Sequence, residues 1–569
     1  MAGLIGLLFG IYGIWLFFAF AQVPMDSDFA SLVLIAQDIL DGNYLLSDWN
    51  LTGATFLFSE VPFYLIGVLL FGVSTKAYLA ASWLMALVLF LLGFLTLKGR
   101  KGFLQLFLYF ALAAFPGTFL IYSARAHVGI FVLCFLALLC LDASARKNDA
   151  ESFNVGTGLF YFLLIVLGTA SDLFIIPVLV LPVLIYCFRG ILSNRDQSVR
   201  LLWKWLGITL AGVLTGWLLE RLILSAGGAE LNSRIGVVEF TPLASIPQTL
   251  QLFTGLLLEL FNAGWDGLRV FSIQSVFLPF RIAVLVLGIW ALVRSLKEFA
   301  SGNLEDRISI LISLGIVCQT GLLIFLPFVT GRSAGRYFSY FPIAFAVLIL
   351  RRIEKDDWLN RKICQGQGTL KALIFPFALI LLISGIRPLP ATRIVSPQDQ
   401  LATFLRERQL TDGYADFWQA NHVAVASEGS VRPRAISFDA VDGAVNLHPD
   451  NWFNKNSWYQ NPQANFIVVM DGSPSSVNES NIRKYIGTPQ ETLRLAPYSS
   501  HDQRNRGKMK QFFKSRPITL KALPILLALI AFLSYGLVIR KLGIYWDDWA
   551  YLWTKMELGY AGVVRHFSF

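Results

Sequence analysis

The sequence predicts an all-α polytopic membrane bundle with a small α/β extracytoplasmic domain. The 569-residue chain is 55% hydrophobic and only 15% charged, whereas soluble proteins carry about 25% charged residues. Its apolar residues also gather into runs approaching the length of about 20 residues that is needed to cross a bilayer. Disordered, collagen-like and disulfide-stapled classes are excluded, and the five cysteines show no metal-binding spacing.

The apolar runs define the expected membrane helices. Because several runs are short for a span, we expect about 11–13 transmembrane helices. The first run has no basic residues before it and no small-residue cleavage site after it, so it is interpreted as an uncleaved helix. The candidate segments are 4–22, 56–72, 77–97, 103–123, 127–141, 156–170, 173–188, 205–224, 276–293, 308–329, 336–350, 370–386 and 518–539.

Basic residues predict the orientation. Eighteen Lys and Arg residues lie in one set of loops, and six lie in the loops that alternate with them. Since Lys and Arg concentrate in cytoplasmic loops, the richer set is expected inside the cell. The net charge of +10 therefore reflects orientation and not nucleic acid binding. The richer set comprises 98–102, 142–155, 189–204, 294–307 and 351–371.

One segment conflicts with a simple alternation of sides. If 4–22 and 56–72 both crossed the membrane, the basic loop 98–102 would lie outside. We therefore prefer a half-embedded or juxtamembrane position for 56–72. The alternative is that one basic cluster breaks the rule.

Three regions follow. Residues 1–386 form the transmembrane domain with an acidic outer loop, 24–55, and residues 387–508 are a soluble extracytoplasmic α/β domain. In that domain Ser396-Pro397 predicts a helix start. Short runs predict strands at His422–Ala426, Ala435–Phe438 and Phe466–Met470.

The last region, 509–569, has a basic flank, an apolar run and then an Asp pair. This order repeats that of residues 4–28, so 509–569 is interpreted as the truncated start of a second, similar protein. An ordinary anchoring helix with an interfacial tail is the alternative.

Carboxylates gather just beyond the first helix. Asp26 and Asp28 follow its end directly, and Asp48 and Glu60 come later on the same side. Carboxylates at a membrane boundary are costly unless they are solvated, paired or used in chemistry. A simply hydrophilic outer loop is the alternative interpretation.

Cationic groups are expected on the same face. Arg332 and Arg336 bracket a Gly-containing turn, and Arg125 and His127 lie at another outer turn. Two guanidinium groups suit a phosphate, because they offer paired donors and stay charged. Snorkelling of the arginines to lipid headgroups, and a packed histidine, are the alternatives.

These residues resemble the GT-C membrane glycosyltransferases, which include protein O-mannosyltransferases and the aminoarabinose transferase of lipid A. The resemblance covers roughly residues 1–508. Its motifs are Asp26-Ser-Asp28 after the first helix, then Ser59-Glu60-Val61-Pro62, and Gly413–Trp418, which looks like a recurring segment of bacterial members. Val61 departs from relatives that carry Lys there, which leaves phosphate binding to the arginines.

The resemblance implies an enzyme in the inner membrane of a bacterium. It would move a hexosyl or pentosyl group from a polyprenyl-phosphate sugar to a hydroxyl of a lipid, glycan or protein on the outer face, with inversion. Membrane lipids would be its other partners, and nucleic acid would not be one.

The resemblance also implies roles for single residues. Asp28 would be the general base, with Asp26 as its competitor, and Glu60 and Asp48 would orient the acceptor or a metal. No cofactor is required, although a divalent cation (Mg²⁺ or Mn²⁺) on Asp26 and Asp28 suits their chemistry. The donor phosphate would meet Arg332, Arg336, Arg125 and His127, and the acceptor would meet Tyr337, Tyr414 and Trp418.

Other classes remain open. A transporter or flippase of lipid-linked glycans would favour ionisable residues near the midplane and internal repeats. A glycan ligase or polymerase would share the donor class with a different helix arrangement, and a non-catalytic cell-envelope scaffold would use the outer domain to bind a partner. Acidic residues concentrated at one surface favour the transferase.

Overall fold

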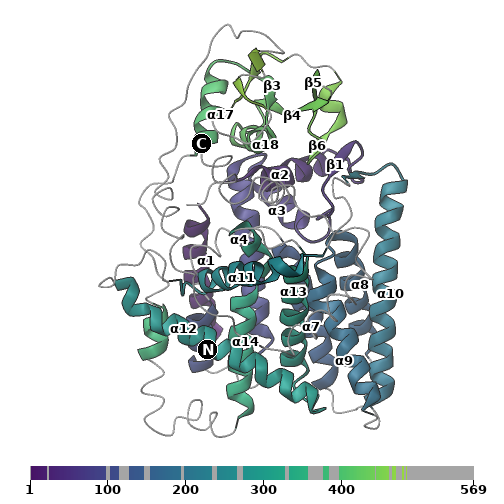
Figure 1. The fold of residues 1–569 in the computed structure, drawn as a ribbon, viewed down its shortest axis with the longest axis vertical. Helices are drawn as coiled ribbons and strands as arrows, with labels where there is room; N and C mark the ends of the chain where they lie inside the picture. Colours follow the sequence, from purple (N-terminus) through teal and green to yellow (C-terminus); the bar gives the residue numbers. More distant parts are fainter. Residues whose placement is uncertain are drawn as a thin grey trace.

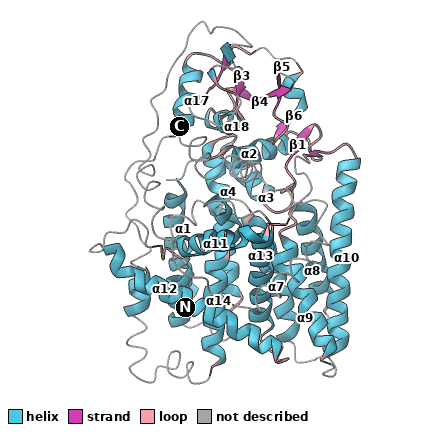
Figure 2. Ribbon diagram, viewed as in Figure 1, coloured by secondary structure: helices cyan, strands magenta, loops and turns pink. Residues whose placement is uncertain are grey.

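The molecule is a helical bundle with a smaller α/β unit at one end (Figures 1 and 2). The structure is a computed structural model, and the residues that it describes are 2–21, 25–97, 103–113, 127–146, 154–193, 198–232, 240–264, 273–326, 332–356, 376–382, 396–441, 444–460, 464–469, 477–479 and 482–483. Of the expected segment 370–386 only 376–382 is described, as helix. The segment 518–539 and the whole region 509–569 lie outside the described residues.

Apolar helices build the bundle. Within the described chain, four helices are long and apolar enough to cross a membrane: Thr75–Leu95, Val199–Ser225, Ser275–Ala300 and Arg307–Phe325. They fall in α4 (Thr75–Leu95), α10 (Ser198–Ser225), α12 (Ile273–Ala300) and α13 (Arg307–Phe325). The remaining bundle helices are α1 (Ala2–Ala21), α5 (Phe103–Ala113), α7 (Val128–Arg146), α8 (Val155–Ser171), α9 (Leu181–Leu192), which continues the π-helical turn η1 (Ile176–Val180), and α14 (Phe341–Lys355).

Buried ionic contacts gather several of the basic loops at one end of the bundle. The Arg351 guanidinium, on α14, pairs with Asp306 before α13 at 2.5 Å and donates to the carbonyl of Thr96 after α4. Arg307 donates to the carbonyl of Leu141 near the end of α7 at 3.1 Å. The ends of four helices from distant parts of the sequence therefore meet there. We call this the basic end. The opposite end, which carries the α/β unit, is named the outer end after the side that the sequence predicts for that unit.

The helix α3 (Val61–Phe71) has 11 residues, or roughly 16 Å against a hydrocarbon thickness of about 30 Å. Its first turn lies at the outer end, beside the start of α7. The next helix, α4, is long enough to cross and finishes at the basic end. Both ends of α3 therefore lie towards the outer end, and the half-embedded position of 56–72 stays a prediction.

The region after α1 is ordered as a helix and a strand. Asp26 caps α2 (Ser27–Leu40), and β1 (Trp49–Leu51) follows it. Further along the chain, α11 (Ile246–Leu260) follows the short turn η2 (Leu243–Ser245) and runs across the bundle (Figure 1). None of the apolar segments expected from the sequence covers this helix, because polar residues interrupt its apolar run.

We call the α/β unit at the outer end, residues 396–483, the outer unit. It has a four-stranded sheet of order β5-β4-β3-β7. The strand β3 runs parallel to β4 and β7, and β4 pairs antiparallel with β5. The elements are α17 (Pro397–Glu407), β3 (Asp412–Ala415), α18 (Phe417–Ala426), β4 (Arg432–Val441), β5 (Ala444–Pro449), the turn η4 (Asn456–Tyr459) and β7 (Phe466–Ile467).

In the outer unit the expected helix start and one expected strand are confirmed, a second strand is present in part, and a third is wrong. The helix start at Ser396-Pro397 is present as a capping box with Asp399, and strands cover Ala435–Phe438 and Phe466–Ile467. The expected strand His422–Ala426 is wrong, because this segment is the last part of α18. Asp416 caps that helix through the amide of Gln419, and most of the helix is buried between the sheet and α2.

A second sheet joins the outer unit to the bundle. The strand β6 (Asn454–Lys455) pairs antiparallel with β1, and β1 pairs in parallel with β2 (Glu230–Leu231), which follows α10. Asn421 of α18 also donates to the hydroxyl of Ser31 on α2 at 2.7 Å. The outer unit is therefore docked on the acidic loop by backbone and side-chain hydrogen bonds.

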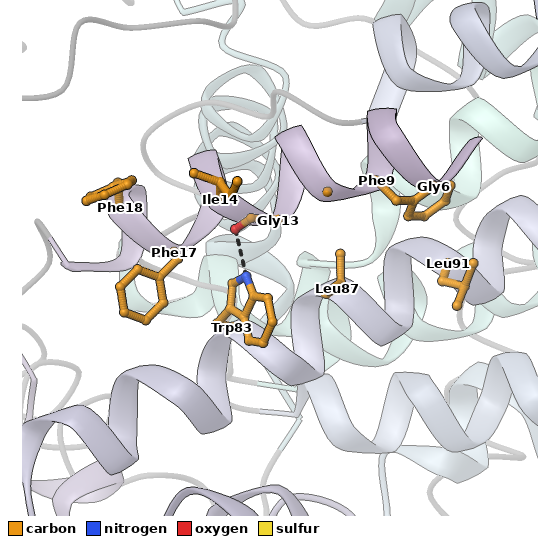
Figure 3. Close-up of a pocket in the computed structure, with 10 residues that line it drawn as sticks. Gly6, Phe9, Gly13, Ile14, Phe17, Phe18, Trp83, Leu87 and Leu91 are labelled. Atoms are coloured by element: carbon orange, nitrogen blue, oxygen red, sulfur yellow. Dashed lines mark hydrogen bonds between the residues drawn. The ribbon is translucent and has the colours of Figure 1, made fainter. Parts of the chain in front are cut away.

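An apolar groove of about 770 Å³ runs between α1 and α4 (Figure 3). Trp83 spans the two helices by donating from Nε1 to the carbonyl of Gly13 at 2.7 Å. Gly6, Gly10 and Gly13 lie along one stripe of α1, and because they have no side chains they leave space for the groove. Its lining includes Gly6, Gly10, Gly13, Phe17, Trp83 and Leu87.

Candidate functional site

The two aspartates after α1 have different positions at the start of α2. The Asp26 carboxylate accepts from the amide of Phe29 at 3.2 Å, as an N-cap does. Asp28 lies in the first turn and is buried, and Trp452 of the outer unit donates to it from Nε1 at 3.4 Å. The positive end of the helix dipole favours both carboxylates.

Glu60 is fully buried immediately before α3. Its carboxyl accepts from the amide of Gly129 at 3.1 Å and from the hydroxyl of Ser59. That hydroxyl lies 2.7 Å from the hydroxyl of Ser171 at the end of α8. Burial raises the pKa of the Glu60 carboxyl to about 8, and the negative charge of Asp172 adds to this effect. Glu60 is therefore protonated through the acid and neutral range.

His127 and Asp172 form a buried pair beside Glu60. The Nδ1 atom of His127 lies 2.5 Å from Oδ2 of Asp172, and both side chains are 2% exposed. The other carboxylate oxygen of Asp172 accepts from the amide of Phe174 at 3.0 Å. His127 directly precedes α7 and Asp172 directly follows α8, so the pair links the outer ends of two neighbouring helices.

Aromatic rings and one arginine enclose this pair. The Tyr337 ring stacks on Phe174 at 5.0 Å and lies 5.3 Å from the imidazole of His127. The Arg336 guanidinium lies 5.1 Å from the centre of the Tyr337 ring. Both residues belong to η3 (Arg332–Phe338), a 3₁₀ segment before α14. The imidazole therefore lies beside a carboxylate and beside a tyrosine ring, which in turn contacts a guanidinium group.

His127 and two phenylalanines that lead to it through ring contacts have left-handed backbones. Phe56, His127 and Phe453 have φ values of 54°, 61° and 47°. Phe453 stacks on Phe56 at 6.4 Å, and Phe56 lies 5.5 Å from His127. Non-glycine residues rarely adopt this conformation, and such strain concentrates at functional sites. The contacts run from the outer unit through the loop before α3 to the buried pair.

The structure brings several of the residues expected from the sequence into one region. Glu60 and His127 interact with Asp172, Tyr337 lies beside the imidazole of His127, and Arg336 lies over the Tyr337 ring. Asp28 is linked to the same region through the outer unit. Trp452 donates to Asp28, and its neighbour Phe453 stacks on Phe56. We call the residues Asp28, Glu60, His127, Asp172, Arg336 and Tyr337 the outer-end cluster.

Other expected site residues lie elsewhere. Asp48 accepts from the amide of Ser457 at 2.8 Å, which holds the outer unit in place. Tyr414 packs beside Ile436 within the outer unit. The ring of Trp418 lies 5.1 Å from that of Phe417. Their expected roles as acceptor-binding residues stay predictions.

Two expected phosphate ligands have no described side chain. Arg125 lies outside the described residues, and Arg332 begins η3, but only its backbone is described. In the part of the chain that the structure describes, no three His, Cys, Asp or Glu side chains are grouped to hold a metal ion.

Asp172 is the member of the cluster to which the sequence analysis gave no role. Asp172 is a single carboxylate directly after an apolar segment. This position was the one feature of the sequence that could have marked it as a site residue. Its partner His127 lies 45 residues away in sequence, so no local pattern joins the two.

Neither a protein-family model nor a curated protein sequence matches this chain. The fold and the site geometry therefore carry the functional argument. The class that they define is a helical protein with segments able to span a membrane and a polar cluster at the end that bears an α/β unit.

Proposed function

We propose that the protein is a GT-C-like integral membrane glycosyltransferase of the bacterial inner membrane. It moves a sugar from a polyprenyl-phosphate donor to a hydroxyl acceptor on the outer face, with inversion. One observation carries the proposal: carboxyl, imidazole and guanidinium groups from separate elements converge at the end of the bundle where the outer unit docks.

The reaction is a single displacement at the anomeric carbon. A bond forms from the acceptor oxygen to that carbon, and the bond from the carbon to the phosphate oxygen breaks. The proton of the acceptor hydroxyl passes to Asp28, and the polyprenyl phosphate leaves with the bonding electrons. Trp452 contacts Asp28 in this structure, so the acceptor hydroxyl would replace the indole as the donor to that carboxylate.

Charge on the departing phosphate needs fixed donors. Arg336 and His127 are the described residues of the cluster that supply them, and Arg332 and Arg125 are proposed in the same role. Preorganised donors in a site of low polarity stabilise developing negative charge more strongly than water does. Glu60 donates or accepts a hydrogen bond depending on its protonation, and it positions the acceptor in this proposal.

The proposed divalent cation would take Asp26 and Asp28 as ligands. Each of these carboxylates already accepts an N–H bond, from Phe29 and Trp452 respectively. Among the described residues no third ligand joins them. The mechanism above includes no step that depends on a metal.

The groove between α1 and α4 suits the lipid part of the donor. The residues that line it are glycine, aliphatic or aromatic, and an isoprenoid chain gains free energy by burying apolar surface against such groups. Gly6 and Gly10 leave open space along α1, where a chain can lie.

Reconstituted protein supplied with labelled polyprenyl-phosphate sugars tests the proposal. The expected result is release of polyprenyl phosphate together with sugar on an added acceptor lipid or glycan, and loss of both in Asp28→Asn. The matched control is Asp41→Asn, an exposed aspartate at the other end of α2. Movement of the intact donor across the bilayer without release would instead identify a flippase. Full activity of Asp28→Asn would refute the role of this base.

A further inference from the structure

The contact between His127 and Asp172 divides the two nitrogen atoms of the imidazole into separate roles. Nδ1 lies 2.5 Å from the Asp172 carboxylate. An imidazole paired in this way meets any further ligand through Nε2, and the carboxylate determines which nitrogen carries the proton. The pair is buried, and a charged hydrogen bond is stronger where water is excluded.

Asp172 is itself held rigidly. One carboxylate oxygen accepts from the amide of Phe174 at 3.0 Å, and the backbone amide of Asp172 donates to the carbonyl of Gly168 at 2.8 Å. Phe56, Phe174 and Tyr337 surround the imidazole at ring distances of 4.6–5.5 Å. The ring therefore has little room to rotate, and its direction follows from the carboxylate.

The charges around the pair are unequal. Glu60 lies close enough to Asp172 for their charges to interact, and burial keeps Glu60 protonated at neutral pH. Asp172 is the carboxyl partner of His127, while Arg336 lies over the Tyr337 ring. Cys134, about two turns further along α7, is a buried thiol.

We propose that Asp172 is a positioning residue for donor phosphate stabilisation: it orients His127 and stabilises its protonated ring, which meets the departing phosphate through Nε2. This inference rests on the proposed function. His127 keeps its proton throughout the displacement, because the acceptor proton passes to Asp28. The phosphate gains one negative charge as the bond to the anomeric carbon breaks, and the imidazolium offsets part of it.

A double-mutant cycle tests the inference in the full-length protein in proteoliposomes. The four proteins are the unsubstituted chain, Asp172→Asn, His127→Gln and the double variant. Loss of the carboxylate that orients a metal-binding histidine costs about 10- to 100-fold in activity, and we expect a loss of the same order for His127. We expect Asp172→Asn to lower kcat by this factor with KM for the donor changed less than about threefold, and to have little further effect when His127 is already Gln.

Two variants separate orientation from folding. His127→Asn keeps an amide donor near the position of Nδ1 and loses the group at Nε2, so it is expected to retain thermal stability and to lose activity. Asp306→Asn removes a buried carboxylate that pairs with Arg351 at the basic end. It is expected to lower the melting temperature and to change kcat by the same factor whether residue 127 is His or Gln.

The outcomes distinguish failure of the proposed function from failure of the positioning role of Asp172. If the unsubstituted protein releases no polyprenyl phosphate, the proposed function fails, and the positioning role fails with it. If it releases polyprenyl phosphate but the losses from Asp172→Asn and His127→Gln multiply independently, the positioning role alone is overturned. A His127→Asn variant with full activity would overturn it as well, without any substitution at Asp172.

Discussion

Phe453 of the outer unit stacks on Phe56 of the loop before α3, with ring centroids 6.4 Å apart and planes 28° from parallel. Both residues have left-handed backbones, and both are buried. Phe453 follows Trp452, which contacts Asp28, and Phe56 contacts His127. The stack thus connects the two sides of the outer-end cluster, and the outer unit contributes directly to the candidate site.

Removing this stack should lower activity more than stability. Phe453→Leu keeps a large apolar side chain but loses the ring contact with Phe56. Small displacements of reacting groups cost up to about 100-fold in rate, so we expect a loss of at least about tenfold in kcat. Phe404→Leu, on α17, is the matched control. Equal activity of the two variants would argue against a role for the stack.

The close approach of α7 to Glu60 depends on glycine. A Cβ atom on Gly129 would lie 2.2 Å from the carbonyl oxygen of Ser59, so the two segments must separate in Gly129→Ala. Overpacking of this kind costs about 1–3 kcal/mol, and the hydrogen bond from Gly129 to Glu60 would lengthen. We expect a lower melting temperature and a loss of activity.

Gly207→Ala is the control for this prediction. Gly207 lies in α10 with open space where its Cβ would be, and alanine stabilises an unstrained helix interior by roughly 0.5–1 kcal/mol. An unchanged melting temperature for Gly129→Ala would contradict the described packing of α7 against Ser59.

The sequence predicted the parts of this fold that depend on local pattern. Long apolar runs located α4 and α13, and the Ser396-Pro397 cap located α17. The apolar and small residues of 422–426 were interpreted as a strand. Burial of α18 on both sides, together with its cap at Asp416, makes this segment a helix, and that burial is a property of the tertiary structure.

The sequence indicated several residues of the candidate site, but it did not indicate which of them contact one another. Glu60, His127 and Arg336 were identified because ionisable groups are rare beside apolar segments. Their partners come from contacts across 69 residues, for Glu60 with Gly129, and 45 residues, for His127 with Asp172. Such contacts follow from helix packing, which a single sequence does not reveal. The contact of Asp48 with Ser457, which joins two domains, could not be seen from the sequence for the same reason, and the expected role of Asp48 stays a prediction.

Protonation of Glu60 should make stability depend on pH. The folded-state pKa of about 8 lies above that of an unfolded chain, near 4.3. The neutral side chain therefore stabilises the fold fully below about pH 4, and this contribution is lost as the pH rises towards 8. The slope of the unfolding free energy is at most about 1.4 kcal/mol per pH unit.

Thermal unfolding in detergent between about pH 5 and 8 measures this dependence. Glu60→Gln should have a smaller decrease in melting temperature over the range, because a neutral amide replaces the titrating group. Glu305→Gln, at a side chain that is 80% exposed, should leave the decrease as it is in the unsubstituted protein. An identical pH profile for Glu60→Gln would show that Glu60 does not titrate in this range.

The groove between α1 and α4 gives a prediction that is independent of the outer-end cluster. Gly10 lines the groove with no atom within 4 Å of its would-be Cβ, so Gly10→Leu places a side chain in the groove without a clash. Since an isoprenoid donor would lose apolar contacts there, we expect KM for the donor to rise about 5- to 50-fold, which corresponds to roughly 1–2 kcal/mol, with kcat nearly unchanged. Gly3→Leu adds the same side chain to α1 in open space outside the groove lining and should leave KM unchanged. Donors with progressively shorter isoprenoid chains should show a decreasing difference between the two variants, and a difference independent of chain length would place the lipid elsewhere.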